Sequence, residues 1–594
     1  MFLRRKRRAH NGIGYDYWQL VRTVRTPRGP RQQVVANLGK LDDDEVARWR
    51  NASWSELDDL LLGREPAVVA PELPGFGSAP TPARVGVDVL GVRLECCREF
   101  GTSYLGLSLW RRLGLHELIA SIVGRGREAL DWERVACTLA IAHFCECRSE
   151  REIAGRWVGD TALCDLLSID PGLLNETRLY RGLDELHACK DDIFRHLQAR
   201  YSDWFGVRYE FLLYDVTSTY FEGEAAGNAK ALRGYSRDQR PGNKQVCIGL
   251  VCSPEGLPLA YEVFDGNRND VTTVEEIVRL MEEKYGQAER VWVMDRGMVS
   301  EHNLEWLRGR GAFYIVGAKR GELRRHEGSL LDKTDWHEVE PGVEVKLLPA
   351  PDGCTERFVV CRSEGRRQKE GAMLERQRKG LLRELQDCAD MLAKGRVRDA
   401  RAIERRVGRW QGRYPAAAAL YEIEVVVDAS GQATGLRYEE KPGRFEHAAL
   451  AHGVYLLRTN HPETDPQRLW KWYIQLTQAE SCFRTVKNDI GLRPVYHQKT
   501  LRVESHILVC FLALAMRRTL EGWMENRGLG TSSHELIKEM ERLQMADVVL
   551  PTQEVGELRL RVVCRPEPEL EVLLVKLGLK LPLTPKPLSN VVPK

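Results

Sequence analysis

The stretch YEFLLYDVTSTYFEG, which runs from Tyr209 to Gly223, decides what kind of core this chain can build. Residues 211–213 form an apolar run typical of a buried strand, and Asp215 follows shortly after it. The pattern predicts that Asp215 lies at the carboxyl end of this strand, with Thr217 to Thr219 either orienting its carboxylate or forming a plain turn. A carboxylate in such a position is costly unless a positive charge neutralises it, so we expect a cation beside Asp215.

A second predicted strand, VWVMDRGM, ends in the same way. Residues 291–294 are of buried-strand type, and Asp295 follows them directly. Two strand-end aspartates of one α/β unit are expected at the edge where such sheets bind ligands. Two converging carboxylates repel each other unless a cation lies between them, and a divalent metal ion is the simplest neutraliser. A site with two ions needs a further carboxylate.

The third acid is expected on a helix within residues 468–490. One stripe of this helix has the spacing of a core face, namely Leu476, Ala479, Phe483, Val486 and Ile490. On a second stripe, Tyr473, Glu480 and Lys487 are seven residues apart, and Arg484 lies one turn after Glu480. An acid flanked by bases and a phenol suits a metal ligand beside a phosphate contact. The alternative is an ordinary Glu–Arg ion pair on a solvated face.

These three motifs together resemble bacterial insertion-sequence transposases of the DDE class. LYDVTSTYF, VMDRGM and the helix pattern Y-x2-L-x3-E-x6-K are similar to the insertion-sequence-four superfamily, whose last acid lies in Y-x2-R-x3-E-x6-K. The segments GNRND, YIVGAKR, GVYLLRTN and LRPVYHQKTLRVESHILVCFLALA also resemble that group. The resemblance covers residues 209–325 and 453–520, and more weakly RQQVVANLGKL near the N-terminus.

The resemblance implies an α/β fold with an RNase H-like catalytic core and a dependence on Mg²⁺, for which Mn²⁺ can substitute. It implies that Asp215, Asp295 and Glu480 are both the metal ligands and the catalytic residues. Tyr473 and Lys487 are then expected to hold the DNA backbone near the scissile phosphate. The chain departs from the signature at one position, because Leu476 replaces its arginine and belongs to the core stripe. Arg484 is the expected substitute for the missing charge.

The implied function is a DNA transposase that acts on double-stranded DNA as a homodimer in a synaptic complex. It would cut at the ends of its insertion sequence and join them to target DNA, by two-metal hydrolysis and transesterification. Three alternatives remain open: a metal-dependent nuclease without strand transfer, a catalytically dead DNA-binding relative, and an α/β protein whose three acids are unrelated.

The pattern of elements divides the chain into six expected segments. In order, they are a basic N-terminal hairpin with a linker (1–90), a helical DNA-binding domain (91–206), the first part of the core (207–325), a β-rich and helical insertion (326–450), the second part of the core (451–525) and a small C-terminal appendix (526–594). The insertion is expected because 185 residues separate Asp295 from Glu480, far more than one helix–strand step needs.

Several residues outside the three acids are candidates for DNA contact. Arg178 and Arg181 lie on a short predicted helix that follows a turn, as in a recognition helix, although packing of that helix is an equal alternative. His497 and Lys499 follow the catalytic helix, where they either reach DNA or fix the turn. Trp410 either stacks on an extruded base or, more commonly, packs a helical hairpin.

Composition sets the remaining limits. The chain has 594 residues, of which 43% are hydrophobic and 29% charged, and its net charge is +3. Basic residues are concentrated in residues 1–35 and 366–413, which suggests surfaces that contact phosphate. We find no secretory signal and no apolar run long enough for a membrane span, so we expect a cytoplasmic protein, and the resemblance implies a bacterial, nucleoid-associated one. The 15 cysteines show no regular spacing, so we expect them to be reduced thiols. His143, Cys145 and Cys147 lie close together in the sequence, but their spacing is poor for binding zinc.

Overall fold

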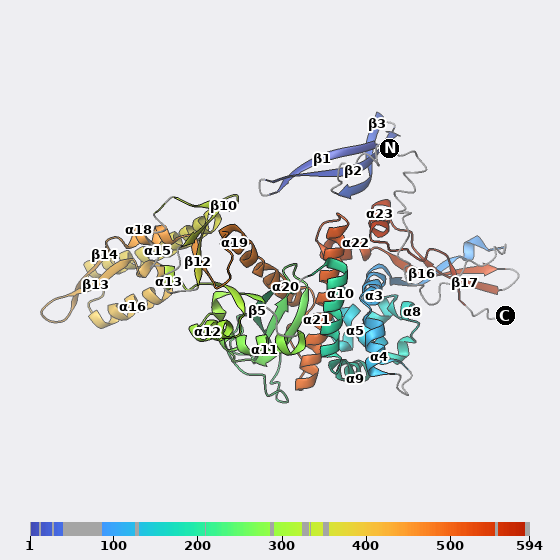
Figure 1. The fold of residues 1–594 in the computed structure, drawn as a ribbon, viewed down its shortest axis with the longest axis horizontal. Helices are drawn as coiled ribbons and strands as arrows, with labels where there is room; N and C mark the ends of the chain where they lie inside the picture. The colour runs from blue at the N-terminus through green and yellow to red at the C-terminus, as the bar shows by residue number, and fades with distance from the viewer. Residues whose placement is uncertain are drawn as a thin grey trace. The chain divides into compact units, whose positions relative to one another are not determined.

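The computed structural model describes residues 2–10, 13–26, 29–39, 86–124, 130–207, 209–285, 290–323, 332, 334–348, 356–552 and 556–588. The chain forms two compact units, drawn together in Figure 1. Unit 1 comprises residues 1–287 and 475–594, and unit 2 comprises residues 288–474. Both contain helices and strands, so the α/β prediction is confirmed. The predicted six-segment division stays a prediction.

Helices dominate the first part of unit 1, as the sequence predicts for residues 101–206. They are α3 (Gly101–Arg112), α4 (Leu115–Val123), α5 (Trp132–Cys145), α6 (Glu150–Glu152), α7 (Val158–Asp160), α8 (Leu163–Leu167), α9 (Glu176–His187) and α10 (Lys190–Phe205), with a π-helical turn at Ile153–Trp157. The long α21 (Thr500–Asn526) runs along α5 and α9 (Figure 1). A methyl group on Gly182 of α9 would overlap Val135 of α5, so glycine permits this close helix packing. None of the described helices combines the length and apolar character that a membrane crossing requires.

An antiparallel sheet of unit 1 carries Asp215. Its strands are β5 (Phe211–Tyr220), β6 (Gln245–Cys252) and β7 (Pro258–Asp265), and α11 (Val274–Tyr285) follows them. The prediction that the strand ends at Asp215 is wrong, because β5 continues to Tyr220, which pairs with Gln245 of β6. Thr217 and Thr219 are β-branched residues that favour strand, and they extend β5 along its partner instead of forming a turn.

The two ends of the chain contribute further sheets to unit 1. Strands β1 (Phe2–His10), β2 (Ile13–Thr26) and β3 (Gly29–Gly39) form an antiparallel sheet, one strand more than the predicted hairpin. The predicted linker at 66–86 lies almost wholly outside the described residues. Helices and strands occupy much of the described part of the predicted C-terminal appendix, residues 526–552 and 556–588. They are α22 (Ser533–Met540), β16 (Gln544–Thr552), β17 (Gly556–Val563), α23 (Pro568–Lys576) and β18 (Lys586–Pro587), and β16 pairs with β4 (Arg93–Glu99).

Unit 2 is built around a mixed sheet with the strand order β10-β11-β12-β15-β9-β8. The strands are β8 (Val291–Met294), β9 (Phe313–Gly317), β10 (His337–Glu340), β11 (Val343–Leu348), β12 (Arg357–Ser363) and β15 (Val454–Thr459). Only β8 and β9 are parallel among the pairings described for this sheet, and α12 (Glu301–Gly309) connects them. Helices α13 (Arg320–Leu323) and α19 (Pro466–Ile474) also belong to this unit.

The predicted insertion separates into two parts within unit 2. Its first strands, β10 to β12, join the same sheet as β15 and β9. The rest forms its own small core from α15 (Glu364–Ala393), α16 (Ala400–Arg413), α17 (Pro415–Ala418), the hairpin β13 (Tyr421–Val427) and β14 (Ala433–Glu440), and α18 (Arg444–Ala451). Trp410 packs against this core, which is the commoner of the two fates considered for it.

Candidate functional site

Asp215 lies in the interior of β5, where its side chain is half-buried. Its own neighbour Val216 donates a backbone hydrogen bond of 2.8 Å to Oδ1. Because alternate residues of a strand share a face, Asp215 faces the same side of the sheet as Thr219. The hydroxyl of Thr219 donates to the carbonyl oxygen of Leu492 at 2.9 Å. Asp215 therefore faces the side covered by the segment that carries Leu492.

That segment begins with α20 (Leu476–Asn488), which packs on β5 and β6. The thiols of Cys482 and Cys252 lie 3.8 Å apart at this contact. All five residues of the predicted core stripe are buried, and Leu476 is only 5% exposed. The prediction that Leu476 packs in the core is therefore confirmed, and its position does not suit contact with phosphate.

Glu480 lies on the flank of α20, beside the core stripe, and is exposed. It forms no hydrogen bond or ion pair with any residue that the structure describes, so the alternative of an ordinary pair with Arg484 is not realised. Arg484 is likewise exposed and unpaired among those residues. The helix thus presents one carboxylate and one guanidinium that are available to a ligand.

Asp295 belongs to unit 2 and directly follows β8, all four residues of which are buried. The prediction that a core strand ends at this aspartate is confirmed. Asp295 begins the short 3-10 helix Arg296–Met298, but its side chain makes no capping hydrogen bond there. Its carboxylate is exposed, which again leaves oxygen atoms available to a ligand.

The helix predicted to run through residues 468–490 is divided. Gln475 lies between α19 and α20, so Tyr473 belongs to a different helix, and to a different unit, from Glu480 and Lys487. Tyr473 is half-buried, and its hydroxyl lies close to Gly317 of β9. Periodicity missed the division because Gln475 keeps helical backbone angles and the residues on either side continue the pattern.

Two of the predicted DNA contacts already have acidic partners. Nζ of Lys487 lies 2.8 Å from Oδ1 of Asp238, whose side chain is only 2% exposed. Burial lowers the pKa of Lys487, and this outweighs the opposite effect of the ion pair with Asp238. Nε2 of His497 lies 3.2 Å from Oε1 of Glu150. Contact of either residue with DNA stays a prediction. For such a contact, a DNA phosphate would have to compete with the carboxylate that already pairs with the side chain.

The other predicted contacts are more accessible. Lys499 is exposed immediately before α21, and Arg181 is exposed on α9. Arg178 is half-buried on the same helix. Since α9 packs against α5 and α21 through its apolar face, Arg178 lies at the border of that face and Arg181 lies on the exposed side. Their role in recognition of DNA stays a prediction.

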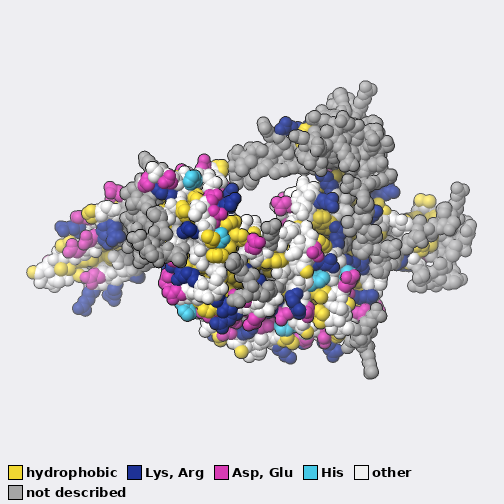
Figure 2. Space-filling view, in the orientation of Figure 1, with side chains coloured by type: hydrophobic (Ala, Val, Ile, Leu, Met, Phe, Trp, Pro, Cys, Tyr) yellow, Lys and Arg dark blue, Asp and Glu magenta, His cyan; other side chains and the backbone are white. Residues whose placement is uncertain are grey.

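A basic stripe on α16 was not among the predicted contacts. Arg401, Arg405 and Arg409 follow one another at intervals of four residues, are exposed, and form no ion pair within the described part of the chain. Arg413 continues the stripe and lies 3.5 Å from Glu384. Figure 2 shows Lys and Arg side chains gathered over this part of unit 2. The interval of four residues was readable from the sequence, but the exposure of the stripe was not.

Each of the three acids carries the type of ligand atom that Mg²⁺ binds. Carboxylate oxygens are hard ligands, which Mg²⁺ and Mn²⁺ prefer to nitrogen or sulfur. Asp295 and Glu480 are both exposed, and Asp215 lies on the face of β5 that α20 covers. Among the described residues, Glu480 in particular has no positive partner of the kind that a structural carboxylate normally has.

Comparison with known proteins identifies the region that contains these acids. Residues 206–516, slightly more than half of the chain, match the family model described as Transposase DDE domain. Residues 3–66 match the model described as IS1634 family transposase, N-terminal domain. A solved structure of the piggyBac transposase synaptic complex with hairpin DNA is 10% identical, with 77% of this chain and 82% of that chain covered. Its TM-score is 0.33, too low to support an inference. No curated protein matches the chain.

Proposed function

Because this chain belongs to the family of transposases with a DDE domain, we propose that it cuts DNA at the ends of its own insertion sequence and joins those ends to target DNA. The observation that carries the proposal is the extent of the family match, which includes Asp215, Asp295 and Glu480. We further propose an RNase H-like core and membership of the insertion-sequence-four superfamily, supported by the Y-x2-L-x3-E-x6-K pattern in the sequence.

The proposed cofactor is Mg²⁺, with Mn²⁺ as a substitute, held by the three acids. When bound, such ions supply Lewis-acid activation of the attacking hydroxyl and stabilisation of the leaving oxygen. The chain's own contribution is positioning. A sheet strand holds Asp215, and Glu480 projects from a helix whose apolar stripe is fixed in the core. Arg484, one turn beyond Glu480, is free to approach a phosphate oxygen.

The proposed substrate is double-stranded DNA, held outside the acids by basic side chains. Lys499 and the arginine stripe of α16 are exposed, which suits contact with the phosphate backbone. We propose that two copies of the chain act together in a synaptic complex, because each copy supplies one set of the three acids whereas an element has two ends. The proposal that the chain binds DNA agrees with its charge distribution, since the chain is near-neutral overall and its basic residues are locally concentrated.

The test is cleavage of labelled DNA that carries the ends of the element encoding this chain, in the presence of Mg²⁺. Wild type is compared with Glu480→Gln, which keeps the size of the side chain and removes its charge. Glu525→Gln is the matched control, because Glu525 is also an exposed glutamate of unit 1 but lies at the end of α21. Binding of the same DNA is measured in parallel by gel shift.

We expect Glu480→Gln to lose at least about a thousandfold in cleavage rate, as removal of groups that act directly on a transition state commonly does. Binding of DNA and the activity of the control should persist. Equal cleavage by wild type and Glu480→Gln would remove Glu480 from the chemistry. Cleavage without joining would favour a nuclease, and binding without cleavage by any variant would favour a catalytically dead relative.

A further inference from the structure

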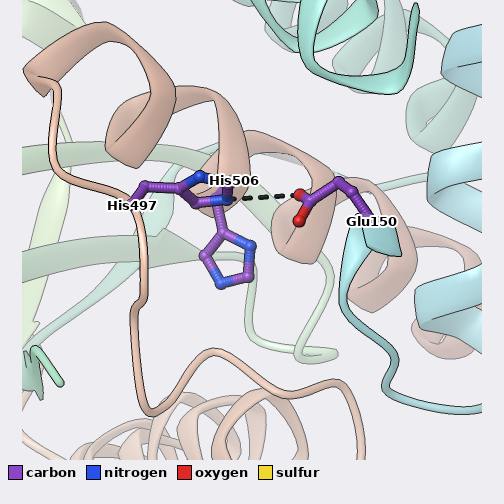
Figure 3. Close-up of side chains that lie close together, drawn as sticks. All are labelled: Glu150, His497 and His506. Atoms are coloured by element: carbon purple, nitrogen blue, oxygen red, sulfur yellow. Dashed lines mark ion pairs between the residues drawn. The ribbon is translucent and has the colours of Figure 1, made fainter. Parts of the chain in front are cut away.

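A second group of ligand-type side chains, which includes none of the three acids, lies in unit 1. Glu150, His497 and His506 each offer one ligand atom, and these atoms all lie within 4.8 Å of one another. They come from three segments: the start of α6, the loop before α21, and α21 itself. Figure 3 shows the two imidazoles and the carboxylate converging from these segments. This group replaces His143, Cys145 and Cys147 as the metal candidate of this region.

The distances in this group are compatible with a shared metal ion. Nε2 of His497 lies 3.2 Å from Oε1 of Glu150, with which it forms an ion pair. Two ligands on a tetrahedral Zn²⁺, each bound at about 2.0–2.1 Å, lie about 3.4 Å apart. The rings of His497 and His506 are 5.5 Å apart, so both imidazoles can turn a nitrogen toward one point.

A thiol adjoins the group. Sγ of Cys510 lies 3.7 Å from Nε2 of His506, one helical turn along α21. A thiolate and an imidazole on one Zn²⁺ lie about 3.6 Å apart, given bonds of about 2.3 and 2.0 Å. His143, also buried here, is fixed differently, because its Nδ1 lies 2.8 Å from the carbonyl oxygen of Ile490.

The surroundings exclude most of the solvent. Glu150 is 6% exposed and His506 is 8% exposed, and the His497 side chain is 10% exposed. Buried carboxylates and imidazoles are usually paired, but here two imidazoles face one carboxylate. A cation that accepts all three ligands satisfies them together. Imidazole ligands favour Zn²⁺ over Mg²⁺, so this site differs in chemistry from the one proposed for the three acids.

We propose that Glu150, His497 and His506 bind one Zn²⁺ ion that has a structural role, and that the Cys510 side chain turns toward the ion as the fourth ligand. The ion would fasten the helical region to the loop between α20 and α21. That loop also lies along β5, since the backbone N–H of Val495 donates to the carbonyl oxygen of Tyr220 at 2.9 Å. The ion therefore stabilises the position of α20 on β5. The metal site itself does not depend on the proposed function.

The test uses the full chain after removal of metal with a chelator, titrated with Co²⁺ as a coloured substitute for Zn²⁺. We expect one equivalent of Co²⁺ to give the intense visible absorption of a tetrahedral site, which Zn²⁺ abolishes and excess Mg²⁺ does not. A site made only of carboxylates and water absorbs weakly, so binding to the three acids is distinguishable. X-ray absorption of the zinc-loaded wild type should show two imidazoles and one sulfur.

Variants assign the ligands. His506→Gln and Glu150→Gln should each weaken Co²⁺ binding at least tenfold, and Cys510→Ser should remove the sulfur-to-cobalt charge-transfer band. His187→Gln is the matched control, because Nε2 of His187 also lies 3.1 Å from a glutamate, Glu504, but no second histidine completes that pair among the described residues. It should bind as wild type does.

Circular dichroism checks that each variant folds. Absence of the tetrahedral spectrum in folded wild type would overturn the proposal without the use of any variant. Unchanged binding by His506→Gln would also overturn it, and an unchanged charge-transfer band in Cys510→Ser would overturn the assignment of the fourth ligand. Cleavage activity is not a readout here, so failure of the proposed function leaves this test unaffected.

Discussion

At the scale of single residues, Asp238 shows how the turn after α20 is held. Its Oδ1 forms ion pairs with both Lys487 and Arg493, while Oδ2 is buried and has no hydrogen-bond partner among the described residues. The carboxylate is 2% exposed, so solvent screens these pairs little. Removing the carboxylate from such a buried group leaves the remaining charges uncompensated. The loss of stability is then larger than the stability that the ion pairs themselves contribute.

We predict that Asp238→Asn lowers the free energy of unfolding by about 3 kcal/mol, because two cations lose their shared counter-charge. Chemical denaturation followed by circular dichroism measures this. Asp160→Asn is the control, since Asp160 pairs with Arg156 at an exposed position and should cost about 0.5 kcal/mol or less. If both substitutions lowered the free energy of unfolding by the same small amount, Asp238 would not stabilise the turn after α20.

At the scale of single elements, α16 presents the clearest surface for phosphate. Arg401, Arg405 and Arg409, which form no ion pair with any described residue, lie on one side of the helix because successive members are four residues apart. The buried residues Ile403 and Val407 fix the opposite side in the small core of unit 2. Apolar contacts therefore hold the helix in place, and the positive charges of the three arginines take no part in this packing.

We predict that replacing Arg401, Arg405 and Arg409 together by glutamine weakens DNA binding and reduces its dependence on salt. The slope of log affinity against log salt concentration should fall by up to about 2.7, or about 0.9 for each lost phosphate contact. Fluorescence anisotropy over a salt series measures the slope. The control replaces Arg156, Arg195 and Arg542, which are ion-paired arginines of unit 1. A slope that falls equally in both would mean that only net charge matters.

A second element-scale contact joins α21 to α9. Glu504 of α21 pairs with His187 at 3.1 Å and with Lys230 at 2.7 Å. Burial alone raises the pKa of Glu504, but the hydrogen bonds from His187 and Lys230 outweigh it and bring the pKa to about 2. The folded protein therefore binds fewer protons at this group than the unfolded chain does between about pH 2 and 4.5, so stability rises with pH in that window.

We predict that Glu504 contributes up to about 3 kcal/mol above pH 4.5 and that this contribution is lost as the pH falls toward 2. Glu504→Gln should therefore lower the melting temperature at neutral pH and flatten its decline in acid. Thermal melts from pH 7 to pH 3 measure this. Glu525→Gln, at an exposed position of the same helix, should keep the wild-type profile. A parallel decline in wild type and Glu504→Gln would contradict the prediction.

At the scale of the whole molecule, residues far apart in sequence complete the helical region of unit 1. Strand β16 pairs with β4, and the backbone N–H of Phe100 donates to the carbonyl oxygen of Leu543 at 2.9 Å. A methyl group on Gly101, at the start of α3, would overlap the carbonyl oxygen of Met540 and lie 2.9 Å from Cβ of Leu543. The region after residue 526 is thus part of this packing.

We predict that Gly101→Ala destabilises unit 1 by about 1–3 kcal/mol, because the added methyl group forces α3 away from the C-terminal segment. Gly159→Ala is the control, since its added methyl group meets no atom of the described residues within 4 Å outside its own stretch of helix. Differential scanning calorimetry of the full chain compares the two. If Gly101→Ala melts as wild type does, the C-terminal segment is not packed as described.

The sequence by itself determined the features that depend on local periodicity and side-chain type. The core stripe of α20, the strand before Asp295 and the helices of residues 101–206 follow from apolar spacing, which local backbone geometry converts directly into buried faces. The order of the three acids was also readable, because each follows or lies within a patterned element.

Only the tertiary structure decided features that depend on partners distant in the chain. Pairing with β6 carries β5 past Asp215, and the division of the chain into two units separates Tyr473 from Glu480. Asp238 meets Lys487, 249 residues away, and Glu150 meets His497. No local pattern encodes such contacts, because their energy comes from burial and charge pairing that exist only after the chain has folded.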